Sequence, residues 1–253
     1  MKSIIITGAG SGIGQAAAIE LEAAGHRLIL VGRTQSKLDS TLASLQKPQI
    51  HHTLSVDIAD AEAFNKALKT IKASELNIFA IFANAGIGGE NHYGEGDRWN
   101  DILNVNLTGT YNSIMESLPY LRASKAPVKH ILMTSSCLAR FGVPNYTAYC
   151  TSKAGLLGLT KALAVELASE QILVNALCPG WVETDMAKAG IQKLADHQEN
   201  PYEQTYKEQM SYVPLGRMSE PIEIAKLVSF FFSEGQRSMT GQGIDINNGS
   251  FMI

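Results

Sequence analysis

Short apolar runs alternate along this chain with longer segments in which apolar residues recur every three or four positions. The short runs predict buried strands, and the longer segments predict helices with one apolar face. Because the short runs are apolar at nearly every position, both faces of the strands should be buried, as in a parallel sheet covered by helices on each side. The pattern predicts strands at residues 3–7, 27–32, 51–57, 77–86, 128–136, 171–180 and 241–249.

The longer segments carry the residue types that helix ends favour. Gly25 follows the first segment, where a glycine often ends a helix, and Pro221 lies in the first turn of the last. About seven strand–helix units without a compositional break predict a single α/β domain over residues 1–253, with a doubly wound parallel sheet of the Rossmann type and helices on both faces. The pattern predicts helices at residues 15–25, 59–73, 97–121, 148–168 and 220–233.

Composition narrows the possible functions. The formal net charge of -3 argues against a nucleic-acid partner, which would favour a basic surface. The first apolar run is too short for a signal peptide or a membrane span, so we expect no membrane association. The cysteines, Cys137, Cys150 and Cys178, lack the spacing of a metal site. We therefore expect reduced thiols, no metal and a cytoplasmic protein.

The residues just beyond the strands are the candidates for function, because ligands of such sheets bind at the carboxyl ends of the strands. TGAGSGIG lies between the first strand and the first helix. Its glycines allow a close approach of the backbone to a ligand, and the helix N-terminus favours a pyrophosphate. The spacing differs from the Gly-x-Gly-x-x-Gly fingerprint, and a turn needed only for packing is the alternative. We predict a dinucleotide site at Gly8, Ser11, Gly12, Ile13 and Gly14.

The second strand ends in VGRT, where a dinucleotide site usually has an acid that binds the ribose 2′-hydroxyl. Arg33 stands 19 residues after Gly14, and Gly32 leaves no carboxylate beside it. A guanidinium there would pair with a 2′-phosphate through charge-assisted hydrogen bonds. We therefore predict NADP(H) rather than NAD as the cofactor; a solvated arginine at the strand end is the alternative.

A tyrosine and a lysine, Tyr149 and Lys153, lie four residues apart near the start of the helix expected at 148–168. Positions i and i+4 share one helix face, so the ammonium could lower the pKa of the phenol. Tyr146 lacks such a partner, because Cys150 occupies its i+4 position. The pair alone does not separate catalysis from chance, since this spacing is common.

Taken in order, the glycine loop, the NAG after the fourth strand and the Tyr-x-x-x-Lys pair resemble the motifs of the short-chain dehydrogenase/reductase family. The resemblance covers nearly the whole chain and implies an oxidoreductase that uses a nicotinamide dinucleotide. The family's Asn-Asn-Ala-Gly motif departs at one position, where Ala83 replaces the first Asn. Besides the glycine loop and Arg33, the resemblance implies cofactor contacts at Asp57, Ile58, Asn84, Ala85, Gly86, Tyr149, Lys153, Pro179, Gly180, Val182 and Thr184.

The resemblance also implies a catalytic set of Asn106, Ser136, Tyr149 and Lys153. Tyr149 would exchange a proton with the substrate oxygen, Ser136 would hold that oxygen, and Lys153 would lower the pKa of Tyr149 and bind the nicotinamide ribose. Asn106 would hold a water that connects Lys153 to solvent. An asparagine inside a helix costs roughly half a kcal/mol relative to alanine, which favours a functional reason for Asn106. Ser135 would be a buried hydroxyl.

These residues predict an NADP(H)-dependent oxidoreductase that reduces a ketone, such as a 3-oxoacyl thioester, to a secondary alcohol by hydride transfer, with Tyr149 as the acid/base. Two alternatives stay open: an NAD-dependent secondary alcohol dehydrogenase, and a non-catalytic dinucleotide-sensing protein on the same fold. The family commonly forms tetramers, so the resemblance implies a homotetramer built through the two long helices and the C-terminal segment.

Residues 185–217 are polar and long for a connection, so we expect a mobile substrate lid inserted in the domain. Residues 87–96 and 137–146 would form the other walls of a substrate pocket. The side chains that could face a substrate, or simply pack, are Trp181, Met186, Tyr202, Tyr206 and Met210.

The segment CPGWVETDM, together with the expected lid, resembles bacterial 3-oxoacyl thioester and polyketide ketoreductases. Reductases that act on carrier proteins tend to place arginines late in the catalytic helix, where this chain has Glu170 and Gln171. Arg122, Lys125 and Lys129 keep a basic character after the preceding helix. An acyl-CoA or a small free ketone is therefore at least as good a substrate prediction as a carrier-bound acyl group.

Overall fold

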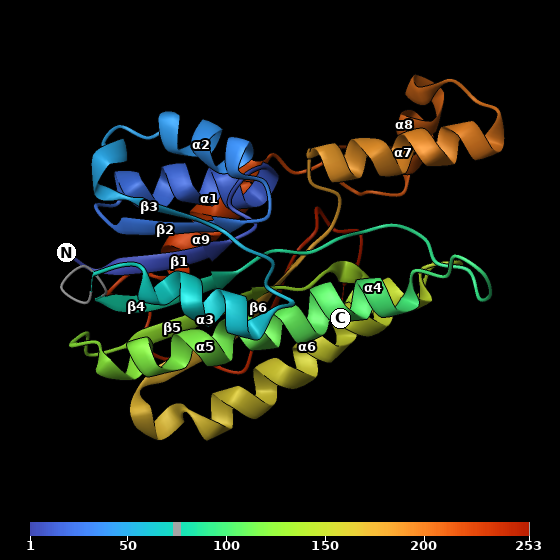
Figure 1. The fold of residues 1–253 in the computed structure, drawn as a ribbon. Coiled ribbons are helices and arrows are strands. Elements are labelled where there is room, and N and C mark those ends of the chain that lie inside the picture. Colours follow the sequence, from blue (N-terminus) through green and yellow to red (C-terminus); the bar gives the residue numbers. More distant parts are fainter. Residues whose placement is uncertain (73–76, 253) are drawn as a thin grey trace.

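The computed structural model describes residues 1–72 and 77–252, which form one parallel sheet flanked by helices (Figure 1). The strands lie in the order β3-β2-β1-β4-β5-β6-β7, and each neighbouring pair is parallel. The chain winds outward from β1 in both directions, so the predicted doubly wound fold is confirmed. The strands are β1 (Ser3–Thr7), β2 (Arg27–Gly32), β3 (His52–Ser55), β4 (Ile78–Ala83), β5 (Lys129–Thr134), β6 (Ile172–Pro179) and β7 (Gly243–Ile246).

Helices cover both faces of the sheet. α1, α2 and α9 lie on one face, and α3, α5 and α6 lie on the other (Figure 1). The helices are α1 (Gly12–Ala23), α2 (Gln35–Ala43), α3 (Ala61–Lys69), α4 (Trp99–Leu103), α5 (Thr110–Ala123), α6 (Thr147–Glu166), α7 (Asp185–Gln198), α8 (Tyr202–Ser211) and α9 (Pro221–Phe231).

The buried strands supply side chains to two separate cores. In β1, Ile5 packs in the α3–α5–α6 layer, whereas Ile4 and Ile6 pack in the α1–α2–α9 layer, because successive strand side chains point to opposite faces. All three side chains are fully buried, and each burial contributes about 1.5–3 kcal/mol. This two-sided burial explains why the strands are apolar at nearly every position.

Two helix ends form as predicted. Gly25 has a φ of 88°, and its N–H donates to the Glu22 carbonyl while the His26 N–H donates to the Leu21 carbonyl. These two bonds make the ending that a C′ glycine permits. Pro221 is the first residue of α9, where its missing N–H leaves no helical bond unmade.

The long helix predicted at residues 97–121 forms, but it is not α-helical throughout. The structure has α4, then a π-helical stretch, η3 (Asn104–Gly109), and then α5. A π-helical turn holds one more residue than an α-helical turn, and such turns often mark functional sites. Here the Asn106 side chain bonds to backbone groups outside its own helix, so the wider turn coincides with a specific contact.

α2 is not predicted by the sequence analysis, because its segment is polar. Its buried residues are Leu38 and Thr41, so the apolar face is too narrow to produce a clear helical pattern. Of the helix expected at 59–73, α3 forms the central part, and residue 73 lies outside the described residues.

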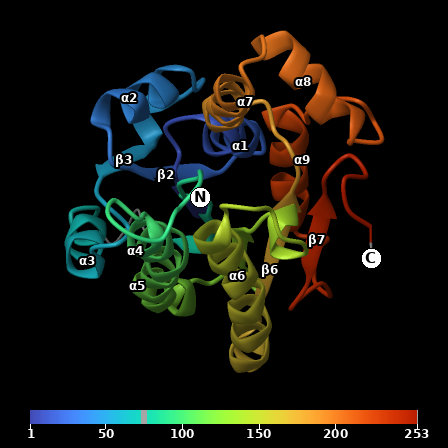
Figure 2. The same ribbon diagram turned by 90° about the vertical axis from the view of Figure 1, so that its right-hand side faces the viewer.

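The α7–α8 segment, residues 185–217, stands apart from the layers of the main body (Figures 1 and 2). Since it contributes nothing to the two large cores, it needs a core of its own. A small apolar cluster supplies that core, formed by Ala187, Ile191, Met210, Val213 and the adjoining Met218.

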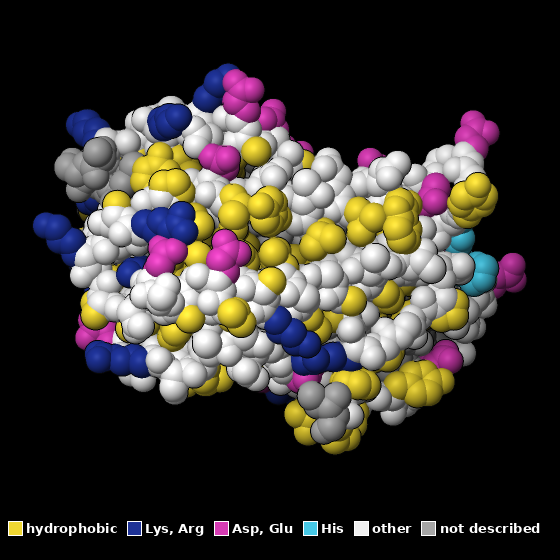
Figure 3. All heavy atoms as spheres, turned by 90° about the horizontal axis from the view of Figure 1, so that it is seen from below, with side chains coloured by type: hydrophobic (Ala, Val, Ile, Leu, Met, Phe, Trp, Pro, Cys, Tyr) yellow, Lys and Arg dark blue, Asp and Glu magenta, His cyan; other side chains and the backbone are white. Residues whose placement is uncertain are grey.

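The surface of the α5–α6 side is mixed in character. Lys and Arg side chains lie there in separate groups, with acidic and hydrophobic side chains between them (Figure 3). Tyr111 of α5 and Val165 of α6 are both exposed. No helix in the described part of the chain combines the length and apolar character needed to cross a membrane.

Candidate active site

Side-chain hydrogen bonds connect the carboxyl ends of β1, β4 and β5. The Thr7 hydroxyl oxygen accepts from the backbone N–H groups of Asn84 and Ala85, at 3.0 Å each. The Asn84 amide donates to the Thr7 carbonyl at 3.2 Å, and its oxygen accepts from the Thr134 hydroxyl at 3.0 Å. The predicted residues Asn84 and Ala85 therefore lie at the floor of a site in which the Asn84 side chain joins three strands.

At Gly8, Gly12 and Gly14 the loop between β1 and α1 has no room for a side chain. Gly8 and Gly12 have φ values of 67° and 52°, a region that favours glycine. A Cβ on Gly14 would lie 2.2 Å from the Gly8 carbonyl oxygen. Ser11 precedes α1, and its hydroxyl makes no cap bond there, whereas Ile13 packs against the core. The loop presents bare backbone at the N-terminus of a 12-residue helix, which fits a pyrophosphate.

A cavity lies beside the glycine loop, with Arg33 and Asp57 among its lining residues. The Arg33 Nη1 and the Asp57 Oδ2 are 3.9 Å apart, and the two side chains are 61% and 41% exposed. The Asp57 Oδ1 accepts from the Ala59 N–H at 2.9 Å, which fixes the carboxylate. An exposed guanidinium above mostly apolar walls fits the adenosine half of a phosphorylated dinucleotide. The cavity is lined by Gly8, Gly32, Arg33, Val56, Asp57, Ile58, Ala85, Gly86, Ile87 and Val105.

The predicted residues Pro179, Gly180, Val182 and Thr184 carry the chain from β6 to α7 along the same edge of the sheet. Val182 forms a parallel bridge with Ser219, which fixes this connection to the segment before α9. The Thr184 hydroxyl caps α7, and its methyl group would lie 2.9 Å from a Cβ on Gly12. The connection therefore lies against the glycine loop and brings two predicted cofactor segments together.

Three of the four predicted catalytic residues lie together at the end of β5 and the start of α6. The Lys153 Nζ is 5.6 Å from the centre of the Tyr149 ring, one turn earlier on the same helix. Ser136, in the segment after β5, is buried, and its hydroxyl acts on the Tyr149 phenol, whose pKa it lowers. A hydroxyl pair of this kind can donate to one substrate oxygen.

Burial decides the protonation of both titratable groups. It raises the pKa of Tyr149 to about 12, although the hydrogen bond with Ser136 acts in the opposite direction. This direction is opposite to the lowering that the sequence analysis expects from Lys153, because the charged phenolate loses hydration when it is buried. Burial also lowers the pKa of Lys153 to about 8. At neutral pH Tyr149 is therefore a phenol that can give a proton, and Lys153 is mostly an ammonium.

Hydrogen bonds hold Lys153 at both ends. Its Nζ donates to the Thr134 carbonyl at 2.8 Å, and its backbone carbonyl accepts from the Ser135 hydroxyl at 2.8 Å. Ser135 is 2% exposed, so it is the buried hydroxyl that the sequence analysis predicts. The ammonium is therefore fixed relative to β5, the strand that also leads to Ser136.

Asn106, the fourth predicted residue, is fully buried in η3. Its amide oxygen accepts from the Ile87 N–H at 2.8 Å, and its amide nitrogen donates to the Ile87 carbonyl at 2.9 Å and the Ser152 hydroxyl at 3.2 Å. A Cβ on Gly86 would lie 3.1 Å from the Asn106 Oδ1 and 3.4 Å from the Lys153 Nζ. The amide thus holds the segment after β4 against α6, and Gly86 leaves the space that Lys153 occupies.

Two further residues lie near Tyr149: Met186, one of the predicted pocket candidates, and Asn91, which was not predicted. Met186 reaches back from α7, and its sulfur would lie 3.0 Å from a Cβ on Gly88; the Tyr149 ring lies at 4.0 Å from the same point. Asn91 bonds to the start of α6 and is 7% exposed. The sequence does not distinguish Met186 from the four other pocket candidates. For Asn91, the sequence indicates only that it lies in the expected pocket wall at 87–96.

The other candidate substrate residues pack within the α7–α8 segment. Met210 is part of the small core there, and Trp181, Tyr202 and Tyr206 pack against that core. The rings of Tyr202 and Tyr206 also stack, with their centres 6.3 Å apart. For these four residues the packing alternative is therefore the observed one, whereas Met186 is half exposed.

The cysteines carry no evident chemistry in the structure. Cys137, Cys150 and Cys178 are free thiols, and burial raises the pKa of Cys137 to about 11. A thiol with a raised pKa is a poor nucleophile at neutral pH. In the described residues no group of three or more His, Cys, Asp and Glu side chains could hold a metal ion.

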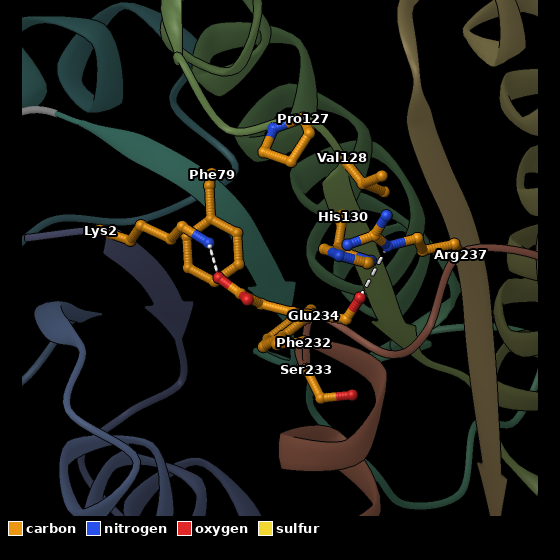
Figure 4. Close-up of a pocket in the computed structure, with 9 residues that line it drawn as sticks. All are labelled: Lys2, Phe79, Pro127, Val128, His130, Phe232, Ser233, Glu234 and Arg237. Carbon is orange, nitrogen blue, oxygen red and sulfur yellow. Dashed lines mark hydrogen bonds and ion pairs between the residues drawn. The ribbon is translucent and has the colours of Figure 1, made fainter.

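A second, small cavity lies near the amino ends of β1, β4 and β5, opposite the glycine loop (Figure 4). Lys2 donates to Glu234 at 2.8 Å across its mouth, and Arg237 donates to the Glu234 carbonyl at 2.9 Å. Burial lowers the pKa of His130 to about 4, so this histidine is neutral at pH 7, where it packs between Phe79 and Phe232. The polar groups satisfy one another, and the site described above remains the candidate for chemistry.

Comparisons with known proteins agree with this geometry. Residues 8–250 match the family described as enoyl-(acyl carrier protein) reductase. The chain is 34% identical to the 3-oxoacyl-(acyl-carrier-protein) reductase of Aquifex aeolicus, covering 99% of this chain and 97% of the relative. It is 29% identical to a variant of actinorhodin polyketide ketoreductase solved with NADPH, with a TM-score of 0.92 and coverage of 98% and 97%. A 3-ketoacyl-(acyl-carrier-protein) reductase from Brucella melitensis, solved with NADH, is 25% identical, with a TM-score of 0.84 and 98% coverage of each chain.

Proposed function

The chain belongs to the short-chain dehydrogenase/reductase family, and on that premise we propose that it reduces a ketone to a secondary alcohol with hydride from NADPH. The observation that carries this proposal is the cluster of Ser136, Tyr149 and Lys153 at the carboxyl edge of the sheet, beside the glycine loop. A fold of this kind hosts many functions, so the residues of the site, and not the fold, favour this one.

The proposed proton donor is Tyr149. When bound, NADPH supplies the hydride that reduces the carbonyl carbon. The carbonyl oxygen, held by the hydroxyls of Ser136 and Tyr149, gains negative charge and takes the phenolic proton. Because burial raises the pKa of Tyr149 to about 12, the proton is present on the phenol across the neutral range.

Lys153 stabilises the phenolate that this transfer leaves behind. Its ammonium lies near the Tyr149 ring and is fixed by the Thr134 carbonyl. A positive charge close to a buried phenolate offsets part of its lost hydration. We propose that Asn106 holds a water through which a proton returns to Lys153, since a Cβ on Gly86 would lie 3.1 Å from the Asn106 Oδ1 and 3.4 Å from the Lys153 Nζ.

The proposed cofactor is NADP(H). What supports it is the exposed Arg33 at the end of β2, where the preceding residue in the sequence is Gly32 rather than an acid. The NADPH complex of one relative adds support, whereas the NADH complex of another keeps NAD as the second candidate. Asp57 also favours NAD, because its carboxylate lies 3.9 Å from the Arg33 guanidinium and would compete with a 2′-phosphate for that group.

The proposed substrate class is a medium-sized ketone, with 3-oxoacyl thioesters as its best representative. The relatives named as 3-oxoacyl reductases support the acyl group. Arg122 is engaged by Glu170 through two hydrogen bonds of 2.7 Å, so its charge is already matched. That pairing favours a CoA-bound or free ketone over a carrier protein, whose acidic surface would need unpaired cations. The α7–α8 segment is the proposed lid over this substrate.

We also propose that the protein is a homotetramer. Tyr111 and Val165 are exposed on the long helices α5 and α6, and Phe230 is exposed on α9. Exposed apolar side chains on two faces suit two different contacts between subunits.

The test is NADPH oxidation at 340 nm with 3-oxoacyl-CoA esters and small diketones as substrates. Tyr149→Phe removes the proton donor, so turnover should fall by roughly 10²–10⁴-fold. Tyr146→Phe is the matched control, because its ring packs edge-on against Tyr149, with centres 6.3 Å apart, but lacks the lysine one turn later. The control should keep turnover within about twofold of wild type.

The same assay tests the cofactor. Arg33→Ala should lower kcat/KM for NADPH by roughly 10–100-fold, the loss expected for charged hydrogen bonds, and should leave the value for NADH unchanged. Equal losses with both cofactors would overturn the NADP assignment. Cofactor binding without turnover of any ketone would instead favour the dinucleotide-sensing alternative.

A further inference from the structure

We propose that Asn91 is a positioning residue for Tyr149, acting through the first turn of α6. This inference rests on the proposed function, in which Tyr149 gives the proton. Asn91 lies in the loop after β4, far from α6 in sequence, yet its side chain is buried against the start of that helix.

The first turn of α6 receives its cap from this distant residue. The Asn91 Oδ1 accepts from the Thr147 hydroxyl at 3.0 Å and from the Ala148 N–H at 2.9 Å. Tyr146, the residue directly before α6, makes no side-chain cap. A helix end whose N–H groups lack partners frays, and Tyr149 is the third residue of this helix. The cap therefore acts on the turn that carries the proton donor.

A second pair of bonds fixes Asn91 itself. Its backbone N–H donates to the Asn145 carbonyl at 2.8 Å, and its Nδ2 donates to the Asp97 Oδ1 at 3.1 Å. The same Asp97 oxygen accepts from the Trp99 N–H at 3.0 Å, at the start of α4. One amide–carboxylate pair thus connects the start of α6 with the start of α4, which leads directly into the π-helical stretch of Asn106.

The hydrogen-bonding chemistry of Asn91 and Asp97 explains why an amide stands at position 91. At the start of α6, the Thr147 hydroxyl and the Ala148 N–H both donate, so they require an acceptor. The Asp97 carboxylate accepts, so it requires a donor. An amide of this length offers both groups in one side chain, and an ionised carboxylate offers acceptors alone. A carboxylate at position 91 keeps an acceptor but faces Asp97 with a second negative charge in a partly buried place, and their repulsion should move the side chain away from the start of α6 and weaken the cap.

The experiment combines Asn91→Asp, Asp97→Asn and the double variant, each assayed with NADPH and the best ketone of the wild-type enzyme. Asn91→Asp should lower kcat by roughly 10–100-fold, the loss expected when a reacting group is misplaced by about 1 Å. The Kd for NADPH should stay within about twofold of wild type, because the cofactor residues are untouched. Asp97→Asn in the Asn91→Asp background removes the facing charge and should recover much of the lost kcat.

Thr147→Val gives a milder variant, since it removes one donor to Asn91 without changing the loop. It should lower kcat several-fold and leave the melting temperature nearly unchanged. If kcat stays within about twofold of wild type in both Asn91→Asp and Thr147→Val, the proposal is wrong. Equal losses in kcat, NADPH affinity and folded fraction would also overturn it, because they would indicate a merely structural role.

Hydrogen exchange separates this proposal from the proposed function. Amides at residues 147–152 should exchange faster in Asn91→Asp than in wild type, while those of α5 should not change. This comparison needs no substrate. If exchange is faster in Asn91→Asp but the wild-type enzyme reduces no ketone, the cap is established and the ketoreductase function is contradicted. If exchange is unchanged in Asn91→Asp, the proposal that Asn91 caps α6 is wrong.

Discussion

The floor of the candidate site and the α7–α8 segment above it are built in different ways. In the floor, the ends of β1, β4 and β5 are joined through Thr7, Asn84 and Thr134, and the neighbouring Lys153 donates to the Thr134 carbonyl. The α7–α8 segment is instead held by its own apolar cluster and joins the body at its two ends, through the Val182–Ser219 bridge and Thr184 on one side and through residues 214–217 on the other.

This difference separates two tasks. Directed hydrogen bonds fix positions and angles, and a proton transfer between buried groups requires that precision. An apolar cluster keeps a segment folded while leaving its placement on the body to the contacts at its two ends. The floor is therefore suited to the chemistry, and the α7–α8 segment is suited to the choice of substrate. Met186 is the side chain of that segment that comes close to Tyr149.

The largest expected effect comes from adding one methyl group to the floor. In Gly14→Ala the new Cβ would lie 2.2 Å from the Gly8 carbonyl oxygen, so the glycine loop must move. We expect a loss of stability of about 1–3 kcal/mol and the loss of measurable NADPH binding, followed by thermal unfolding and fluorescence titration.

The matched control adds the same methyl group to the α7–α8 segment. In Gly190→Ala the nearest atoms of Trp181 lie at 3.7 and 3.8 Å, which is ordinary contact. Alanine favours a helix over glycine, so α7 should gain roughly 0.5–1 kcal/mol. Destabilisation by both substitutions would show that the two regions do not differ as proposed.

The pH dependence of reduction should come from the floor alone. Burial lowers the pKa of Lys153 to about 8, so the ammonium is lost as the pH rises through that value. Since the ammonium stabilises the phenolate, kcat/KM for ketone reduction should fall above about pH 8, by up to about tenfold per pH unit. Stopped-flow rates between pH 6 and 10 would measure it. Lys153→Met should remove this limb, and Met186→Ala should keep it; a flat wild-type profile would contradict the assignment.

The smallest expected effect is a change of substrate preference. Met186→Ala opens space beside Gly88 and Tyr149 without touching the hydrogen bonds of the floor. The ratio of kcat/KM for bulky over small ketones should rise by roughly tenfold, mainly through KM. Met186→Leu keeps the bulk and should behave as wild type. A large fall in kcat for small ketones would place Met186 in the chemistry instead.

The fold could be predicted from the sequence because its signals are local, whereas the candidate catalytic set followed from the resemblance to a known family. Apolar strands, the glycine loop and the spacing of Tyr149 and Lys153 each depend on neighbours within one turn or one strand. The doubly wound pattern leaves few topologies open, but the order of the strands was not predicted and comes from the structure.

The remaining features depend on contacts between distant segments, and the sequence gives no direct signal for them. Asn91 caps a helix from a loop that precedes it by more than 50 residues, and Met186 reaches a glycine near the opposite wall. The raised pKa of Tyr149 follows from burial, which depends on the packed structure rather than on the spacing of Tyr149 and Lys153. The polar helix α2 was missed because its apolar face is only two residues wide.

The π-helical stretch makes the site sensitive to insertions and deletions. Since each residue advances an α-helix by about 100°, loss of one residue between Asn104 and Gly109 would rotate α4 relative to α5 by about that angle. Asn106 would then turn away from Ile87 even if every side-chain type were kept. In relatives of this chain, point substitutions in this segment should therefore be tolerated better than changes in its length. An alignment gap there would indicate a site with a different arrangement of residues.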